Sequence, residues 1–325
     1  MIEEICDHLQ SLDQYKQVSS ENVHVEPLQT LEHSEVYRIR IDSPSSTLIL
    51  KRTGTSDVAG LAERERRFYR HIAALLPASL VPECLLLVEG DQAGLLFIED
   101  LFGSHQPATS PEPTRLQCCC FVEALATLHG LTGRDSTIQN RWQEIAADLP
   151  AGTIEQRLGF FDLVRGSFIA MIRDQVDLET EKFLTGLSSL EEQILGLTPE
   201  TNVLVHGDAH FANALFSSAP DACLIDWGMP MIGFGEIDLA HALALNLPPH
   251  LRRQWEAEML DVYLDRMAAC GSPIGREACY ERYRLGVLYS FVSPVIWWHS
   301  GVPEQQWRAV LNNSLGAARD LGLIS

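Results

Sequence analysis

Residues 206–213 read His-Gly-Asp-Ala-His-Phe-Ala-Asn, and residues 224–227 read Leu-Ile-Asp-Trp. The apolar run at 203–205, which precedes the first motif, is short enough for a buried strand. Between the two motifs the sequence passes from apolar residues 214–216 through a stretch rich in Ser and Pro into apolar residues 223–225. This order predicts a strand, a turn and a second strand, so that one short hairpin carries both motifs.

Folding this hairpin brings Asn213 and Asp226 to the same end, and Asp208 lies on the loop that leads into it. One Asp on a loop, with an Asn and a second Asp nearby, is the set of groups that metal-assisted phosphoryl transfer uses. One carboxylate orients and deprotonates a hydroxyl, while the Asn and the other Asp hold Mg²⁺ against nucleotide phosphates. Either Asp alone is better explained as a carboxylate that caps or turns a loop, so the interpretation depends on the whole motif.

The pattern His-Gly-Asp-x-His-x-x-Asn followed by Ile-Asp-Trp resembles the aminoglycoside phosphotransferase and choline-kinase-like superfamily of small-molecule kinases. Its members share the protein-kinase fold but carry His-Gly-Asp where protein kinases carry His-Arg-Asp. The resemblance covers roughly residues 30–245, with the motifs in the right order, whereas residues 246–325 carry no motif that matches.

The length of 325 residues suits two lobes, and a hydrophobic content of 46% is ample for a core. We expect an α+β, bilobal, protein-kinase-like fold. Residues 1–101 would form a small β-rich N-lobe with one key helix, and residues 102–325 a larger, mostly helical C-lobe with the catalytic loop, the metal site and the acceptor pocket. A Pro-rich stretch after Leu101 marks the boundary. Helices are expected near 113–130, twice within 154–196, from Glu236, and at 251–270, 276–292 and 304–320.

Charge and composition exclude several classes of partner. The net charge is −20, from 24 Lys and Arg against 44 Asp and Glu, which disfavours nucleic acid and anionic membranes because phosphate binding requires Lys and Arg. A cationic substrate would suit this charge, but solubility accounts for an acidic surface equally well. The eight Cys lack zinc spacing, and we find no signal peptide and no membrane span, which predicts reduced thiols in a cytoplasmic protein.

The N-terminal third contains a cation and a carboxylate that the predicted elements bring together. Residues 36–41 and 47–52 are expected to form a hairpin that carries Lys51. The helix expected at about 59–76 has an apolar stripe that includes Glu65. A carboxylate on a buried helix face needs a partner, and Lys51 is the obvious one. The apolar members of the stripe are Leu61, Phe68, Ile72, Leu75 and Leu76.

In kinase-like folds a strand Lys holds the α- and β-phosphates of the nucleotide, and a helix Glu holds the Lys. We therefore assign Lys51 and Glu65 to the nucleotide site, and not Glu63, which lies off the apolar stripe. The alternative is that Glu65 is an exposed carboxylate in a charge-rich helix.

The resemblance also implies where the rest of the nucleotide lies. A second hairpin is expected from residues 85–88 and 95–98, and its last strand runs into Glu99-Asp100-Leu101. In the resembled superfamily such a strand end is the hinge whose backbone meets the adenine, so Glu99 and Leu101 are expected there. The loop that covers the phosphates is expected near residues 31–35, where Ser34 and backbone N–H groups would replace the missing glycines.

Several other polar residues receive structural roles. We expect His206 to bond backbone near Asp226, His210 to orient the loop and His129 to be packed in the core. Asp238 is expected to tie down the catalytic loop, although capping its own helix is the alternative. The aromatic cluster near the C-terminus is expected to be core packing, with an acceptor pocket for a cation as the alternative. Its members include Tyr289, Trp297, Trp298, His299, Glu304 and Trp307.

These inferences predict a kinase that uses ATP (or GTP) and Mg²⁺ to phosphorylate a hydroxyl of a small molecule. The acceptor classes left open are an aminoglycoside or other antibiotic, an amino alcohol such as choline, a sugar and a nucleoside-like metabolite. One rival is a nucleotide-binding relative without catalysis, which would act as a binding module. The other is a protein kinase, which the His-Gly-Asp motif and the short segment between Asp226 and Glu236 disfavour.

Replacing Asp226 by Ala should abolish Mg²⁺-dependent nucleotide binding, and Asn213→Ala should weaken it less, because an ionised carboxylate is the stronger ligand for a hard cation. Calorimetric titration of each variant with Mg·ATP measures the effect. Unchanged affinity in Asp226→Ala would show that the metal assignment is wrong.

Overall fold

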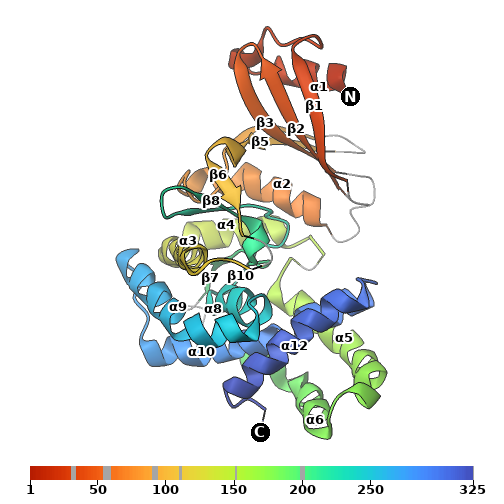
Figure 1. The fold of residues 1–325 in the computed structure, drawn as a ribbon, viewed down its shortest axis with the longest axis vertical. Coiled ribbons are helices and arrows are strands. Elements are labelled where there is room, and N and C mark those ends of the chain that lie inside the picture. Colours follow the sequence, from red (N-terminus) through yellow and green to blue (C-terminus); the bar gives the residue numbers. More distant parts are fainter. Residues whose placement is uncertain are drawn as a thin grey trace.

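The computed structural model describes residues 1–30, 34–53, 60–89, 94–109, 112–150, 152–197 and 202–324. Figure 1 shows a strand-rich part, built from the first hundred residues, above a larger part that is mainly helical. The fold is therefore mixed α+β, as the sequence predicted, and its first part is an antiparallel sheet with the order β1-β2-β3-β5-β4. The strands are β1 Val23–Thr30, β2 Ser34–Asp42, β3 Ser45–Thr53, β4 Cys84–Val88 and β5 Leu95–Glu99.

Alternation along β3 gives the sheet two apolar faces, because successive side chains of a strand point to opposite sides. Leu48 and Leu50 pack with helix α1 (Ile2–Leu9) on one side. Ile49 belongs to the larger core on the other side, which also contains helix α2 (Leu61–His71). Lys51 has the parity of Ile49, so the alternation of the strand directs it toward α2.

Both predicted N-terminal hairpins are present, as β2–β3 and β4–β5. Strand β1 was not predicted from the sequence. It lies at the edge of the sheet, where polar side chains such as His24 and Glu26 and a Pro at position 27 are tolerated.

Helix α2 is shorter than the predicted 59–76. It ends at His71, and a 3₁₀ turn, η2 (Ala73–Leu75), follows it. Phe68 and Ile72 are fully buried as expected, but Leu61 and Leu75 are exposed. The stripe is wrong at its ends because Leu61 opens the helix and because the tighter turn changes the direction of Leu75. Residues 54–59, which include the expected start of the helix, lie outside the described residues.

The second part contains two small sheets surrounded by helices (Figure 1). Strand β7 (Asn202–Val205) pairs with β10 (Met231–Phe234), and β8 (Ala214–Ser217) pairs with β9 (Ala222–Leu224) and with β6 (His105–Pro107). The β8–β9 hairpin is the predicted one. The α-helices are α3 Arg115–Arg134, α4 Ser136–Ala146, α5 Ile154–Ile172, α6 Leu178–Gly186, α7 Leu190–Leu195, α8 Glu236–Ala240, α9 Pro249–Ala269, α10 Arg276–Tyr289, α11 Val292–His299 and α12 Glu304–Asp320.

The described segment 152–197 thus holds three helices, α5, α6 and α7, where two were expected. None of the helices in the described ranges combines the length and the hydropathy that a membrane span requires. The largest apolar core runs from α2 through α3 and β7 to α12. Because this core continues across Leu101, the division into lobes of residues 1–101 and 102–325 stays a prediction.

Helix α3 does not end at Gly130, as its sequence suggested, but continues to Arg134. A Cβ at Gly130 would lie 2.5 Å from the Cβ of Cys270, which caps the end of α9. The glycine is therefore explained by a close contact between two helices and not by a helix end.

Replacing Gly130 by Ala should lower the free energy of unfolding by about 1–3 kcal/mol, because the new methyl group overlaps Cys270. The matched control is Gly159→Ala in α5, where nothing lies within 4 Å of the new Cβ. There the same change should raise the free energy of unfolding by about 0.5–1 kcal/mol, since Ala favours a helix. Urea unfolding measures both, and changes of the same sign would contradict the close contact.

Candidate active site

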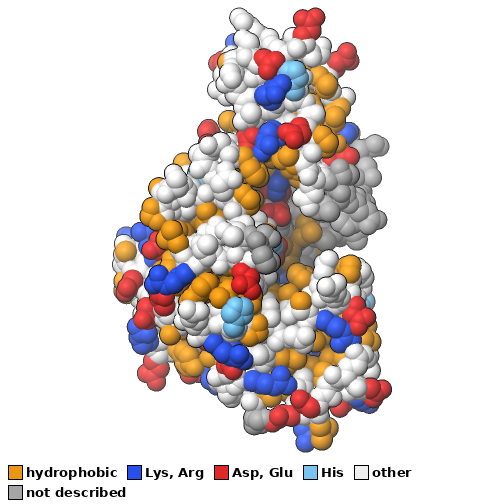
Figure 2. All heavy atoms as spheres, in the orientation of Figure 1, with side chains coloured by type: hydrophobic (Ala, Val, Ile, Leu, Met, Phe, Trp, Pro, Cys, Tyr) orange, Lys and Arg blue, Asp and Glu red, His pale blue; other side chains and the backbone are white. Residues whose placement is uncertain are grey.

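The hollow between the strand-rich part and the helical part carries side chains of both charges (Figure 2). Lys51 on β3 reaches two carboxylates. Its Nζ lies 2.6 Å from Oε1 of Glu65 on α2 and 3.3 Å from Oδ1 of Asp226, which follows β9. The structure thus brings together three of the predicted site residues, from three separate elements.

Glu65, and not Glu63, pairs with Lys51, as the helix stripe predicted. Glu63 instead bonds the guanidinium groups of Arg66 and Arg67. Burial would lower the pKa of Lys51, but the charges of Glu65 and Asp226 outweigh burial and raise that pKa above its ordinary value. Lys51 is consequently a permanent cation at any physiological pH.

Helix α2 is fastened to the segment that carries Asp226. The ring of Phe68 stacks on Trp227 with 4.0 Å between ring centroids and an interplanar angle of 6°. The fully buried Arg64 donates from Nη1 to the carbonyl oxygen of Gly228 at 2.6 Å. Both contacts lie within one turn of Glu65, so the helix carboxylate and Asp226 are held in a fixed relation.

The loop after β7, which carries the His-Gly-Asp motif, depends on the glycine of that motif. Gly207 has φ +77°, and a Cβ there would lie 1.9 Å from the carbonyl oxygen of Met229. A side chain is therefore excluded by the neighbouring backbone as well as by the left-handed conformation.

The fully buried Asp238 carboxylate receives the backbone N–H groups of His206 at 2.6 Å and Gly207 at 2.9 Å. Its Oδ2 also lies 3.1 Å from Nε2 of His129, which is itself fully buried. Burial would raise the pKa of Asp238, but the bonds and charge from His129 and the loop amides keep it below its ordinary value. These contacts confirm that Asp238 ties down the loop and that His129 is a packed residue.

His206 links the loop to the second motif, as expected, because its Nε2 bonds the carbonyl oxygen of Ile225 at 2.9 Å. At the end of the hairpin the N–H of Ile225 donates to the carbonyl oxygen of Asn213 at 2.9 Å. The predicted juxtaposition of Asn213 and Asp226 follows from this closure. Asp226 itself has φ +65°, a conformation that Asp tolerates better than most residues.

The Asp208 carboxylate is surrounded by donors. Nδ2 of Asn213 donates to Oδ2 at 3.1 Å, Nε2 of His210 lies 3.5 Å from Oδ2, and Nε2 of His241 lies 3.4 Å from Oδ1. Burial would raise the pKa of Asp208, but the His210 and His241 rings hold it well below its ordinary value. Asp208 is therefore ionised, and with its side chain 30% exposed it can accept a hydrogen bond from an incoming hydroxyl.

His241 was not predicted as part of the site. The available signal was its spacing, since it follows Asp238 by three residues on a predicted helix and so shares its face.

The predicted hinge has a structural explanation for its polar residues. Asp100 accepts a hydrogen bond from Nε of Arg38 at 2.8 Å and another from the backbone of Phe102. Leu101 is buried, and it packs in a small cluster with Leu215, Cys223 and Ile225, on the hairpin that ends at Asp226. Glu99 ends β5 with its side chain exposed, so the adenine contacts stay a prediction. Residues 31–33 and the side chain of Ser34 lie outside the described residues.

The C-terminal aromatic cluster is only partly core, because Tyr289 and Trp307 are buried whereas Trp297 and Trp298 are half-buried and His299 is exposed. Trp307 is buried against Phe168, with 5.5 Å between ring centroids, and the guanidinium of Arg308 lies 4.6 Å from its ring. Glu304 forms an ion pair with Arg308, so the cation over the Trp307 ring is a side chain of this protein. Packing, the first of the two interpretations, therefore accounts for Trp307, whereas Glu304 is an exposed residue paired with Arg308.

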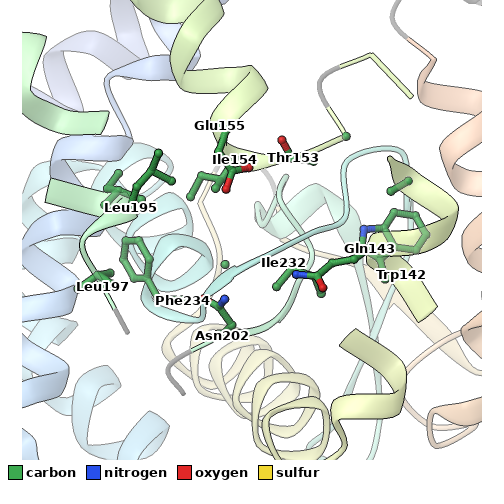
Figure 3. A pocket seen from close by; sticks show the side chains of 14 residues that line it. Trp142, Gln143, Thr153, Ile154, Glu155, Leu195, Leu197, Asn202, Ile232 and Phe234 are labelled. Atoms are coloured by element: carbon green, nitrogen blue, oxygen red, sulfur yellow. The ribbon is translucent and has the colours of Figure 1, made fainter. Parts of the chain in front are cut away.

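A separate cavity of about 210 Å³ lies between α4, α5, α7 and β10 (Figure 3). Its lining is mixed, with polar groups from Gln143, Thr153 and Asn202 among apolar ones. None of the predicted site residues lines it, so it does not belong to the arrangement around Asp208.

The fold and this set of residues define a small-molecule phosphotransferase of the protein-kinase-like class. Residues 24–278 match the phosphotransferase enzyme family (APH), and the chain belongs to that family. No curated protein matches the sequence.

Solved structures with a similar fold include two choline kinases. One is from Cryptosporidium parvum Iowa II, with a TM-score of 0.66, 13% identity, and coverage of 99% of this chain and 98% of that one. The other is LicA from Streptococcus pneumoniae, with a TM-score of 0.56, 15% identity and 98% of each chain covered. Spectinomycin phosphotransferase APH(9)-Ia, in complex with ADP and spectinomycin, has a TM-score of 0.55 and 14% identity, with 90% of this chain and 88% of that chain covered.

Replacing Glu65 by Gln should lower kcat/KM for Mg·ATP by about ten- to a hundredfold, because a charged hydrogen bond to Lys51 is weakened by about 1.5–3 kcal/mol. The matched control is Glu63→Gln on the same helix turn, which should leave kcat/KM within about twofold, since the contacts above join Glu63 to Arg66 and Arg67 and not to Lys51. Steady-state kinetics with varied Mg·ATP measures both. Equal losses in the two variants would mean that Glu65 acts through helix stability alone.

Proposed function

We propose that this phosphotransferase transfers the γ-phosphoryl group of ATP to a hydroxyl of a small molecule, with Mg²⁺ as the metal. The observation that carries the proposal is the position of Lys51, whose Nζ lies 2.6 Å from Glu65 and 3.3 Å from Asp226. A cation fixed in this way can hold the α- and β-phosphates beside a carboxylate that faces the same space. GTP, which has the same phosphates, remains the alternative nucleotide.

Asn213 and Asp226 fit a hard cation. They offer one carboxamide and one carboxylate on adjacent ends of a hairpin, and Asp226 is half exposed and already within ion-pair distance of a positive charge. The Nδ2 group of Asn213 donates hydrogen bonds to Asp208, so the side-chain oxygen of Asn213 is the atom that remains to bind a metal. Bound Mg²⁺ would neutralise the charge that develops on the phosphates during transfer.

Asp208 is the group that handles the acceptor. Its ionised carboxylate can accept the hydrogen bond of the hydroxyl and so direct the hydroxyl oxygen at the γ-phosphorus. As the new oxygen–phosphorus bond forms and the bond to ADP breaks, the hydroxyl proton passes to Asp208. Because the carboxylate is a weak base, orientation contributes more to the rate than proton abstraction, which is worth about 10²–10⁴-fold.

The class of acceptor is inferred from the similar structures and from the net charge. The similar structures include choline kinases and a spectinomycin phosphotransferase in complex with spectinomycin. The net charge of −20 would favour capture of a cationic acceptor, by raising its concentration near the surface. Steering of this kind weakens as salt rises, so the salt dependence of KM for the acceptor distinguishes a cation from a neutral sugar or nucleoside.

The test of the function is release of ADP from Mg·ATP in the presence of a panel of acceptors. The panel should contain choline, an aminoglycoside, spectinomycin, a hexose, a nucleoside and, as the control for a protein kinase, a Ser/Thr peptide mixture. ADP release that depends on one of the small molecules supports the proposal. ADP release with the peptides alone would identify a protein kinase instead. Nucleotide binding without any transfer would identify a binding module without catalysis.

Replacing Asp208 by Asn should lower kcat by about a hundredfold or more while leaving the affinity for Mg·ATP nearly unchanged, because Asp208 faces the acceptor and not the phosphates. Steady-state rates together with calorimetry of Mg·ATP separate the two effects. A variant that keeps more than about a tenth of the wild-type kcat would contradict the assigned role.

A further inference from the structure

The two oxygens of the Asp208 carboxylate have different partners. Oδ2 receives Nδ2 of Asn213 at 3.1 Å and lies 3.5 Å from Nε2 of His210, both within five residues of Asp208 along the loop. Oδ1 lies 3.4 Å from Nε2 of His241, which comes from a different element. Oδ2 is therefore held by residues of the loop, whereas Oδ1 is contacted by His241 from outside the loop.

The His241 ring is not placed there by apolar packing alone. Its side chain is only 9% exposed, and its Nε2 is shielded from solvent and lacks a hydrogen bond of good geometry to the described residues. A buried polar nitrogen without a full partner costs free energy, so its position requires an explanation. The other residues of the same turn, Ala242 to Leu245, are apolar and fully buried. Asp208 is the acidic group that faces this nitrogen.

The backbone around His241 fixes this approach. Helix α8 runs directly into a π-helical turn, η8 (His241–Leu245), of the kind that is frequent at functional sites. The side chain of Asn246 donates to the carbonyl oxygen of His241 at 2.8 Å and closes the turn. Asn313 of α12 donates to the carbonyl oxygen of Leu245 at 3.0 Å, so the turn is also held from the C-terminal helix.

Asp238 and His241 are three residues apart and share a helix face. Asp238 holds the backbone N–H groups that immediately precede Asp208, and His241 faces the side chain of Asp208 itself. Helix α8 is in turn anchored to α10, because buried Glu236 pairs with Arg282 at 3.0 Å and Gly286 packs directly on the backbone of Glu236. Helix α8 and the turn that follows it are thus anchored to α10 and contact the catalytic loop twice. Asp238 binds the backbone of residues 206 and 207, and His241 contacts the side chain of Asp208.

We propose that His241 is a positioning residue, which holds Oδ1 of Asp208 in the direction that an acceptor hydroxyl must meet. The proposal rests on the phosphotransfer role of Asp208 given above. With Oδ2 engaged by Asn213 and His210, Oδ1 is the oxygen that remains for the acceptor, and the His241 ring limits rotation of the carboxylate. A misplacement of about 1 Å in such a group costs about a hundredfold in rate.

The activity test compares three variants. His241→Phe keeps a ring of similar size and removes the N–H donor, and it should lower kcat by about ten- to a hundredfold with the KM for Mg·ATP unchanged. His241→Gln, whose Nε2 can occupy the place of the ring nitrogen, should recover kcat to within about fivefold of wild type. His250→Phe, an exposed histidine on α9, is the control and should change nothing. The rates are ADP release from Mg·ATP with water and with the panel acceptor that gives the highest rate.

Wild-type kcat in His241→Phe would overturn the proposal, and so would equal losses in the Phe and Gln variants, because a packing role does not depend on the donor. A wild-type protein that releases no ADP with water or any acceptor would overturn the proposed function instead.

A second measurement does not depend on turnover. Histidine side-chain ¹H–¹⁵N spectra of the nucleotide-free protein, assigned with His241→Phe, should show that Asp208→Asn shifts the Nε2 signal of His241. The Nε2 signal of His129, which faces Asp238, serves as the internal control and should stay in place. An unchanged His241 signal would show that the contact with Asp208 does not exist in solution. That result would overturn the positioning role, independently of the measured rates.

Discussion

The ammonium group of Lys51 lies between two carboxylates that belong to different parts of the fold, and the geometry of the site depends on this arrangement. A poorly hydrated charge is tolerated only when it is paired, so β3, α2 and the segment after β9 must meet at one point. The stack of Phe68 on Trp227 and the bond from Arg64 to Gly228 hold α2 at the distance where that pairing occurs. The arrangement around Lys51 and the core between the two parts are therefore stabilised by the same helix.

Much of the N-terminal architecture was predictable, because the signals are local. Alternation at residues 36–41 indicated the β2–β3 hairpin, two apolar runs on either side of a turn indicated the β4–β5 hairpin, and the helical period separated Glu65 from Glu63. One failure depended on a partner distant in sequence, and another on a local change of helix type. Strand β10 was not expected because its pairing with β7 spans more than twenty residues of intervening chain, and the exposure of Leu75 reflects the 3₁₀ turn that follows α2.

The same distinction applies to the site. Asp208, Asn213 and Asp226 could be predicted as neighbours because one hairpin joins them, and the structure places them so. The contact of His241 with Asp208 could not be predicted, because it arises from the packing of α8 against α10. The sequence offers no comparable local signal for an acceptor pocket, and Trp307, one of the aromatic residues considered for it, is buried against Phe168 with Arg308 over its ring.

The carbonyl oxygen of Met229 leaves no room for a side chain at position 207, and Arg157 of α5 donates to that same oxygen at 2.8 Å. An arginine at position 207, as in the His-Arg-Asp motif of protein kinases, would have to displace both the carbonyl and a guanidinium that already lies beside it. In this chain, room for an arginine at position 207 would therefore require a rearrangement of the segment after Asp226. The glycine of the first motif and the backbone that follows the second motif thus depend on each other.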